Sequence, residues 1–301
     1  MTAHIRLANA PVSWGIMEVE GWSPPIPYQK VLDEIAGSGY LGTELGPYGY
    51  LPTDSARLRD ELARRSLALT SAFVPLRLKE RAAVEEELEQ ARVVGGLLAA
   101  CGARYLVLAD FLWPERVACA GWAEDAGVAL TAEEWKTVAA NVRRAAAVAR
   151  DLGLRTVFHP HAGTYVETPA EVERLFGEVD AGDLGLCLDT GHSCYGGGDP
   201  VEAVRRYGLR IEYLHLKDVN PQALDAVRRE RLGFLDGIRR DVFCELGRGA
   251  VDFAALKREL EVLGYDGWAV VEQDVDAKRP GAPPPAEAAR GSREFLRGLG
   301  L

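Results

Sequence analysis

The amino-acid sequence predicts an α/β protein built as a single (β/α)8 TIM barrel. Eight short segments rich in apolar and β-branched residues alternate with segments rich in Ala, Leu, Glu and Arg. No GxGxxG pattern follows the first predicted strand, which argues against an open, doubly wound sheet that binds a dinucleotide. The chain has 301 residues, of which 48% are hydrophobic, and α/β barrels of this size are commonly one domain. We therefore expect residues 1–301 to form a single domain.

The strands and helices are predicted from the period of the apolar residues and from signals at the helix ends. Thr131 followed by Glu134 is typical of a capping box, and Pro169 and Pro200 stand where a first helical turn tolerates proline. The predicted strands are residues 6–10, 42–45, 68–73, 105–109, 155–159, 185–189, 213–216 and 268–272. The predicted helices between and after them are residues 28–36, 56–65, 81–100, 132–152, 170–176, 200–207 and 253–263, with a last helix near 287–296.

Two long segments interrupt this alternation, at residues 111–130 and 220–251. Loops of this length in a compact domain are usually functional or disordered. Both follow a predicted strand, so we expect them to emerge at the carboxyl end of the barrel, where such barrels carry their active sites.

The overall charge and the cysteines limit the classes of function. The chain has 35 basic and 45 acidic residues, a net charge of −10, which disfavours nucleic acid and anionic membranes as partners. No segment is apolar enough to predict a membrane span or a signal peptide. The five cysteines are odd in number and lack CxxC spacing, so we expect a cytoplasmic protein without disulfides.

Four predicted strands end in side chains that bind metal ions well. These are His159, Asp189, His215 and Glu272, at the ends of the last four strands. Because the carboxyl ends of barrel strands meet at one face, we expect the four side chains to lie together. Imidazole nitrogens and carboxylate oxygens form a ligand set for a divalent ion, although each residue taken alone could be structural.

Four further residues are candidates for acid, base or charge-stabilising roles. His161 shares strand parity with His159 and could also face the site, so either histidine could be the ligand. His192 could contact substrate or simply occupy a turn, and Lys217 could stabilise an enolate or merely be solvated. Glu44 closes the second strand and could be a general base, bind substrate hydroxyls, or pair with an arginine.

Candidate substrate-binding residues are three aromatic side chains and one arginine. Trp14, Tyr48 and Trp113 lie at predicted loops or strand ends, where a flat face could stack on a sugar ring or simply pack. Arg248 lies between two glycines in the second long segment and could bind an anion.

Five short motifs resemble one known family. They are APVSW (10–14), GTELG (42–46), HPHAGT (159–164), LDTGH (188–192) and LHLKDV (214–219). Together they are similar to the sugar phosphate isomerase/epimerase (xylose isomerase-like) barrel superfamily, and within it they most resemble its keto-inositol dehydratase branch. The resemblance covers nearly the whole chain.

The resemblance implies a barrel that binds a divalent ion, Mn²⁺ or Co²⁺ before Mg²⁺, Zn²⁺ or Fe²⁺, and acts on a sugar, keto-sugar or cyclitol. The family's epimerases hold their metal with Glu, Asp, His and Glu, which Asp189, His215 and Glu272 match here. His159 stands where the epimerases have a catalytic Glu. This departure favours dehydration of a keto-cyclitol over epimerisation.

The reaction that we predict is proton abstraction beside a carbonyl followed by loss of water. The base would be His161 or Glu44, Lys217 would stabilise the enolate, and His192 would be the acid. A ketose 3-epimerase or aldose–ketose isomerase, with a free or phosphorylated substrate, is the first alternative. An apurinic-site nuclease is disfavoured by the net charge of −10 and the five histidines, and a non-catalytic sugar-binding barrel would be expected to lose ligands. A homo-oligomer is compatible with this class of enzyme.

Overall fold

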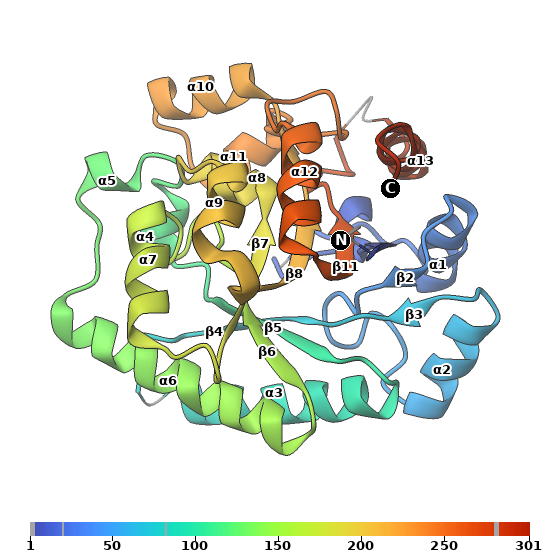
Figure 1. The fold of residues 1–301 in the computed structure, drawn as a ribbon, viewed down its shortest axis with the longest axis horizontal. Coiled ribbons are helices and arrows are strands. Elements are labelled where there is room, and N and C mark those ends of the chain that lie inside the picture. Colours follow the sequence, from blue (N-terminus) through green and yellow to red (C-terminus); the bar gives the residue numbers. More distant parts are fainter. Residues whose placement is uncertain (1–3, 20, 82, 280–282) are drawn as a thin grey trace.

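A computed structural model describes residues 4–19, 21–81, 83–279 and 283–301. A parallel sheet occupies its centre, with helices packed around it (Figure 1). The strand order is β3-β2-β1-β11-β8-β7-β6-β5-β4, and every pairing within this sheet is parallel. Its strands are β1 (His4–Asn9), β2 (Gly42–Thr43), β3 (Ala68–Leu69), β4 (Phe73–Leu76), β5 (Tyr105–Asp110), β6 (Arg155–Phe158), β7 (Gly185–Asp189), β8 (Ile211–Leu216) and β11 (Asp266–Val271).

The two ends of this strand order are consecutive pieces of one chain segment. β3 and β4 are separated only by residues 70–72, where Leu45 N–H donates to Ser71 O at 3.0 Å and Val107 N–H donates to Ala72 O at 3.0 Å. The segment from β3 to β4 is therefore the third strand of the barrel in two parts, bonded to both neighbours. Counted in this way there are eight barrel strands, and the predicted (β/α)8 fold is confirmed.

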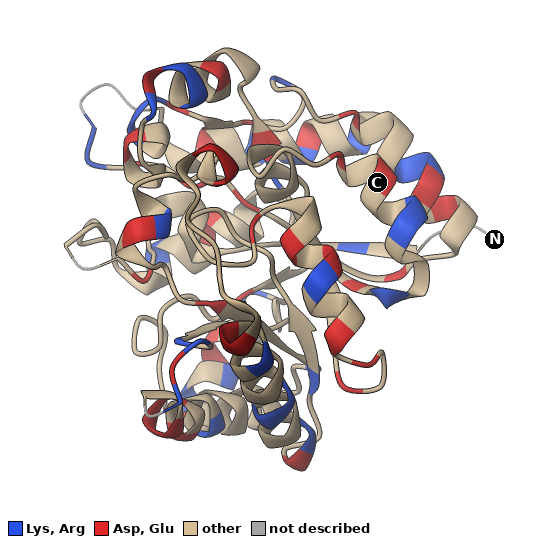
Figure 2. Cartoon of the chain, turned by 90° about the vertical axis from the view of Figure 1, so that its left-hand side faces the viewer, with Lys and Arg blue, Asp and Glu red and all other residues tan. Residues whose placement is uncertain are grey.

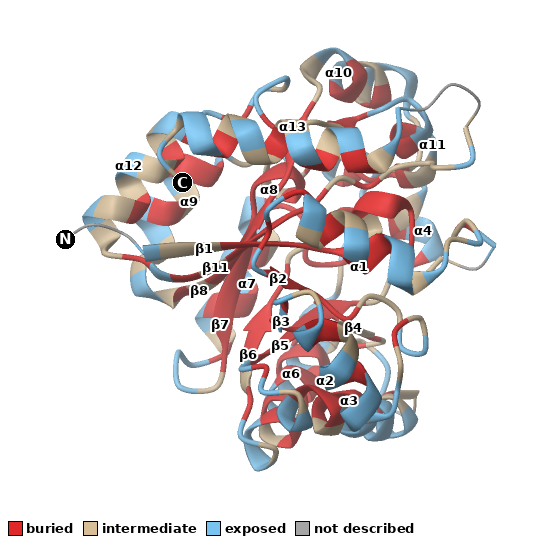
Figure 3. Cartoon of the chain, turned by 90° about the vertical axis from the view of Figure 1, so that its right-hand side faces the viewer, coloured by how far each residue is buried: buried red, intermediate tan, exposed pale blue. Residues whose placement is uncertain are grey.

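The helices agree with the predicted ones within a few residues. Thr131 and Glu134 form the expected capping box, and Thr168 with Glu171 forms a second one before α7. The helices around the sheet bury one side and expose the other (Figure 3), and most of the buried residues are apolar. The helices are α1 (Tyr28–Gly37), α2 (Ser55–Ala63), α3 (Ala83–Ala100), α6 (Ala132–Asp151), α7 (Pro169–Glu178), α9 (Pro200–Tyr207), α12 (Phe253–Leu263) and α13 (Pro285–Gly298).

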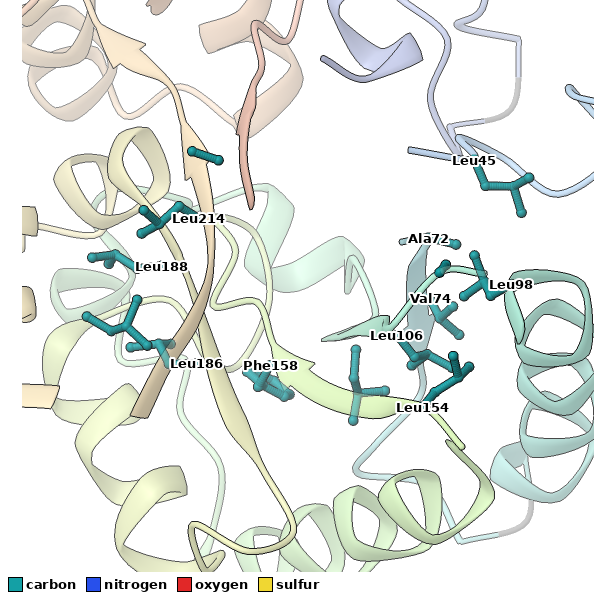
Figure 4. Packing of buried hydrophobic residues seen from close by; sticks show 14 of the residues in the cluster. Leu45, Ala72, Val74, Leu98, Leu106, Leu154, Phe158, Leu186, Leu188 and Leu214 are labelled. Carbon is teal, nitrogen blue, oxygen red and sulfur yellow. The ribbon is translucent and has the colours of Figure 1, made fainter. Parts of the chain in front are cut away.

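The core is divided into two layers by the alternation of side chains along the strands. One layer lies between strands and helices and includes Leu106, Phe158 and Leu186 (Figure 4). The other fills the barrel interior and consists of Ala8, Ala10, Tyr105, Val107, Val157, Cys187, Tyr213 and Val270. The interior residues support whatever side chains follow them at the strand ends.

The two long segments are more ordered than their composition predicts. The first, residues 111–130, contains α4 (Pro114–Val117) and α5 (Ala123–Ala126). The second, 220–251, contains α10 (Pro221–Glu230), α11 (Phe234–Arg239) and β10 (Phe243–Cys244), and β10 pairs antiparallel with β9 (Asp218–Val219). The second segment packs a separate apolar cluster with α8 (Thr190–Tyr195), in which Phe234, Phe243 and Tyr195 meet. They are therefore not simple loops, because each has apolar side chains to bury.

Opposite charges alternate over the outer helices (Figure 2). Arg144 of α6 pairs with Glu85 of α3, and Arg205 of α9 pairs with Glu259 of α12. Exposed pairs of this kind contribute about 0–1 kcal/mol each, so the fold depends mainly on the apolar layers. Within the described part of the chain, no helix has the length and apolarity needed to cross a membrane. All five cysteines are free.

Candidate functional site

The four predicted metal ligands lie at the top of the barrel interior. Each stands two residues after a side chain of the interior layer: Val157 precedes His159, Cys187 precedes Asp189, Tyr213 precedes His215 and Val270 precedes Glu272. Side chains two residues apart on a strand share a face, so each ligand side chain points into the barrel interior, above a packed residue.

The ligand atoms of these four residues lie within 4.8 Å of one another, and all four side chains are buried. Nε2 of His159 is 3.4 Å from Oδ2 of Asp189. Nδ1 of His215 is 3.3 Å from Oε2 of Glu272 and 3.7 Å from Oδ2 of Asp189. The structure thus brings together all four residues that the sequence singled out.

Two of these atoms have unmet hydrogen-bonding capacity. Oδ2 of Asp189 and Nδ1 of His215 are buried and have no hydrogen-bond partner. Buried polar atoms are normally satisfied, and each one left without a partner costs about 1–3 kcal/mol. Two imidazole nitrogens and two carboxylate oxygens converging in this way match a divalent ion of intermediate softness. The residues therefore fit the predicted metal.

Lys217 is a fixed cation beside the ligand set. Its ammonium nitrogen lies 2.7 Å from Asp274, 3.2 Å from Glu272 and 3.5 Å from Asp189. Burial by itself would lower the pKa of Lys217, but the three carboxylates outweigh it and raise that pKa above its usual value. Lys217 is therefore charged at physiological pH.

His161 and His192 stack on each other next to the ligand set, with ring centroids 3.7 Å apart. Nδ1 of His161 lies 2.7 Å from the carbonyl oxygen of Ala162, to which it can only donate, so Nε2 of the neutral ring is free to accept a proton. Nδ1 of His192 accepts from the Ala162 N–H at 3.2 Å. His161 lines the cavity described next, whereas His192 lies behind it.

A cavity of about 350 Å³ opens above the ligand set. Its polar floor includes His159, His161, His215, Lys217 and Glu272, and its walls are largely apolar. The apolar lining residues are Ala10, Pro11, Val12, Ile16, Met17, Val19, Phe73, Pro75, Phe111, Leu112, Pro114, Val117, Phe234 and Leu235. Both long segments contribute to these walls, as their position after strands predicted.

Glu18 is a cavity residue that the sequence did not single out. It follows β1 in an irregular loop, lines the cavity and is exposed to solvent. Reduced hydration of its carboxyl within the cavity, followed by the nearby charges of Glu272, Glu44 and Asp274, raises the pKa of Glu18 to about 8. No periodicity marks a residue in such a loop, so the sequence offered no signal for it.

Asp274 is a second cavity residue that the sequence did not single out as a candidate. It shares strand parity with Glu272, and this parity could have identified it as an interior side chain. Its Oδ1 receives the 2.7 Å bond from Lys217, and it lines the cavity.

None of the four predicted substrate-binding residues lines the cavity. Trp14 is fully buried and donates from Nε1 to Glu34. Trp113 is buried against Tyr165 and Lys79, because its Nε1–H is held by Asp110 at 3.1 Å. Tyr48 and Arg248 are exposed, and Arg248 pairs with Glu245. The two tryptophans fill space between elements instead of facing a ligand.

Comparison with known proteins agrees with this architecture. Residues 32–299 match the family described as xylose isomerase-like TIM barrel. The chain belongs to this family. Its sequence is 35% identical over 295 residues to an inosose dehydratase of Geobacillus kaustophilus, covering 97% of this chain and 93% of that protein. It is 32% identical over 293 residues to an inosose dehydratase of Lacticaseibacillus casei, covering 97% and 96%.

Two solved structures share the fold of this chain at much lower identity. An IOLI protein with a binding zinc atom superimposes with a TM-score of 0.72 at 16% identity, covering 98% of this chain and 97% of the other. A probable 3-DHS dehydratase, AsbF of Bacillus anthracis, superimposes with a TM-score of 0.71 at 16% identity, covering 98% and 99%. At this identity the similarity establishes the fold only.

Proposed function

We propose that this xylose isomerase-like barrel is a divalent-metal-dependent lyase that removes water from a keto-cyclitol such as 2-keto-myo-inositol. The observation that carries the proposal is the convergence of His159, Asp189, His215 and Glu272 beneath one cavity, which all of them but Asp189 line, with a charged lysine beside them. The inosose dehydratases at 35% and 32% identity support the substrate class.

The four ligands would hold Mn²⁺ or Co²⁺, with Mg²⁺, Zn²⁺ and Fe²⁺ as the other candidates. Bound there, such an ion supplies a Lewis acid that polarises the substrate carbonyl and acidifies the neighbouring C–H. Lys217 adds a fixed positive charge against which an enolate oxygen is stabilised. His159 stands where the family's epimerases have a catalytic Glu. Because His159 would be a metal ligand here, a different residue must transfer the proton.

His161 is the base that the geometry favours. Its Nε2 carries no proton in the neutral ring, and the residue lines the cavity. Burial, followed by the neighbouring His159 and Lys217, lowers the pKa of His161 well below its usual value, so the ring is neutral near pH 7. Nε2 takes the proton from the carbon beside the carbonyl, and the electron pair of that C–H bond moves onto the carbonyl oxygen.

Glu18 replaces His192 as the acid in this proposal. His192 lies behind His161, whereas Glu18 faces the cavity with a pKa raised to about 8. As the carbonyl re-forms, the C=C pair of the enolate shifts to the bond between the α and β carbons, and the β C–O bond breaks. The departing hydroxyl takes the proton of Glu18 and leaves as water.

The reaction is tested by incubating the protein with 2-keto-myo-inositol and a panel of ketoses, with Mn²⁺ or Co²⁺, in D₂O. A new diketo absorbance identifies dehydration. Deuterium incorporation with an altered sugar and no absorbance change identifies epimerisation or isomerisation and overturns the lyase assignment. Protein in which no divalent ion can be bound or restored would point to a non-catalytic barrel instead.

The remaining expectations stay predictions. They are a single domain, a cytoplasmic location, a homo-oligomer and the absence of a nucleic-acid partner. The small cavity above the ligand set suits a compact polyol, and it gives no support to the nuclease alternative.

A further inference from the structure

A buried hydrogen-bond network lies directly beneath the candidate metal site and is centred on Oε1 of Glu44. Nε2 of His215 is 2.9 Å from this oxygen, Ser71 Oγ is 2.7 Å from it and the Tyr213 hydroxyl is 3.1 Å from it. Glu44 is only 3% exposed and His215 only 1%. This carboxylate oxygen thus accepts from His215 and Ser71 and lies near the Tyr213 hydroxyl, whose single proton is shared with Thr70 Oγ1 at 2.7 Å.

This contact fixes which nitrogen of His215 carries the proton. A carboxylate oxygen only accepts hydrogen bonds, so Nε2 must donate and therefore holds the hydrogen of the ring. Nδ1 is then the nitrogen with the free lone pair. It is the same atom that lies 3.3 Å from Oε2 of Glu272 and lacks a hydrogen-bond partner.

The break between β3 and β4 holds Glu44 in place. Residues 70–72 leave regular strand geometry there, and the hydroxyls of Thr70 and Ser71 point into the network. The Tyr213 hydroxyl lies 2.7 Å from Thr70 Oγ1 and 2.9 Å from Ser71 Oγ, which ties β8 to the same point. Glu44 is therefore held by hydrogen bonds from two other parts of the barrel.

We infer that Glu44 is a positioning residue for the metal, acting through His215. Its carboxylate locks the Nε2–H tautomer and the ring orientation of His215, so that Nδ1 is presented to the ion. This inference rests on the proposed metal-dependent function. We assign Glu44 this role in place of the general-base role because its Oε1 is engaged by His215 and Ser71, although Glu44 also lines the cavity.

The test is metal binding by the whole protein in the absence of substrate. Co²⁺ is titrated into metal-free wild type, Glu44→Gln and Glu44→Ala, following the visible absorbance of the bound ion. Loss of a carboxylate that orients a ligating histidine typically weakens metal binding about 10–100-fold, and we expect a loss in this range for Glu44→Ala. The loss should be smaller for Glu44→Gln, because the amide oxygen can still accept from Nε2–H of His215. Ser71→Ala, which leaves the Glu44–His215 contact intact, should cause a smaller loss.

A matched control separates positioning from the general effect of changing a buried glutamate. Glu167 is also 3% exposed and accepts backbone bonds from Gly121 and Gly163, away from the four ligands. Glu167→Gln should keep wild-type affinity for Co²⁺. Thermal melts of each metal-free variant verify that it is folded, and Glu44→Leu, which is close to glutamate in volume and has no acceptor, serves if Glu44→Ala does not fold.

The outcomes distinguish this inference from the proposed function. If wild type binds no Co²⁺, Mn²⁺ or Zn²⁺, the metal-dependent function itself fails. If wild type binds the ion and Glu44→Ala binds it equally well while kcat falls, Glu44 acts on the substrate and the positioning role is overturned. Weakened binding by Glu44→Ala, with unchanged binding by Glu167→Gln, supports it.

Discussion

The ammonium nitrogen of Lys217 lies 2.7 Å from Oδ1 of Asp274, at the edge of the candidate metal site. The same nitrogen lies 3.2 Å from Glu272, one of the four proposed ligands. Lys217 thus connects the ligand set to a carboxylate outside it. A buried cation surrounded by acids is expensive to remove, since the acids would be left uncompensated.

Lys217→Met should therefore destabilise the metal-free protein strongly. Breaking a buried pair by removing one partner typically costs about 3–5 kcal/mol, and we expect a loss of this size in urea denaturation. A bound divalent ion would offset part of the uncompensated charge, so Mn²⁺ should stabilise this variant more than it stabilises wild type. Lys136→Met is the control, because Lys136 is exposed and pairs with Glu133 at the surface. A loss below about 1 kcal/mol for Lys217→Met would contradict the prediction.

Asp189→Asn tests the roles of the two carboxylate oxygens of Asp189 separately. Oδ1 of Asp189 caps α8 by accepting from the His192 N–H at 2.8 Å, whereas Oδ2 faces the ligand set without a partner. Asparagine keeps an oxygen for the cap and loses the negative charge. We expect a melting temperature close to wild type and metal affinity lowered by at least tenfold, measured by metal analysis after dialysis.

The matched variant for this prediction is Asp199→Asn. Asp199 caps α9 through Val201 and Glu202 and is not part of the ligand set. It should retain wild-type metal content. Equal metal content in the Asp189 and Asp199 variants would argue that Asp189 is not a ligand.

Gly191→Ala should lower the activity by displacing the side chain of Lys217. A Cβ at position 191 would lie 2.7 Å from Lys217 Cγ, closer than real atoms approach, so the lysine side chain must shift. We expect a clear fall in kcat, although alanine is the better helix former within α8. Gly177→Ala in α7, where nothing lies within 4 Å, should keep full activity and gain about 0.5–1 kcal/mol of stability. Unchanged kcat in Gly191→Ala would show that the exact position of Lys217 is unimportant.

Asp110 should make stability fall as pH rises through a defined window. Burial raises the pKa of Asp110 from 3.8 to about 6, although it accepts bonds from Trp113 and Tyr165. Between pH 3.8 and pH 6 the folded state keeps a proton that the unfolded state releases. The stability that the protonated carboxyl contributes is therefore lost as the pH rises, and this loss is complete above pH 6. The whole window corresponds to about 3 kcal/mol.

Asp110→Asn tests this dependence, because asparagine keeps an acceptor and does not titrate. Urea denaturation of both proteins from pH 4.5 to pH 7.5 gives the difference in unfolding free energy at each pH. That difference should change in favour of the variant by about 2 kcal/mol across the series, because part of the window lies below pH 4.5. A difference that is constant with pH would mean that the pKa of Asp110 is not raised.

The (β/α)8 fold and the four converging ligands were predictable because both depend on local periodicity. Apolar alternation identified the strands, and the side chain at each strand end follows an interior residue by two positions, as Tyr213 precedes His215. Capping signals such as Thr131 with Glu134 set helix ends through contacts only three residues apart. Signals of this kind involve only residues that are close in the sequence, so they can be recognised without the tertiary structure.

The roles of Glu44, Glu18 and Trp14 were decided only by the tertiary structure. Glu44 and His215 are 171 residues apart in the chain, and Trp14 meets Glu34 through the packing of α1 against the first loop. Whether an aromatic ring faces a cavity or fills a core depends on which distant side chains occupy the remaining space. The sequence by itself therefore determined the barrel and its ligand types, while packing between distant segments decided the tautomer of His215, the walls of the cavity and the position of Glu18 within it.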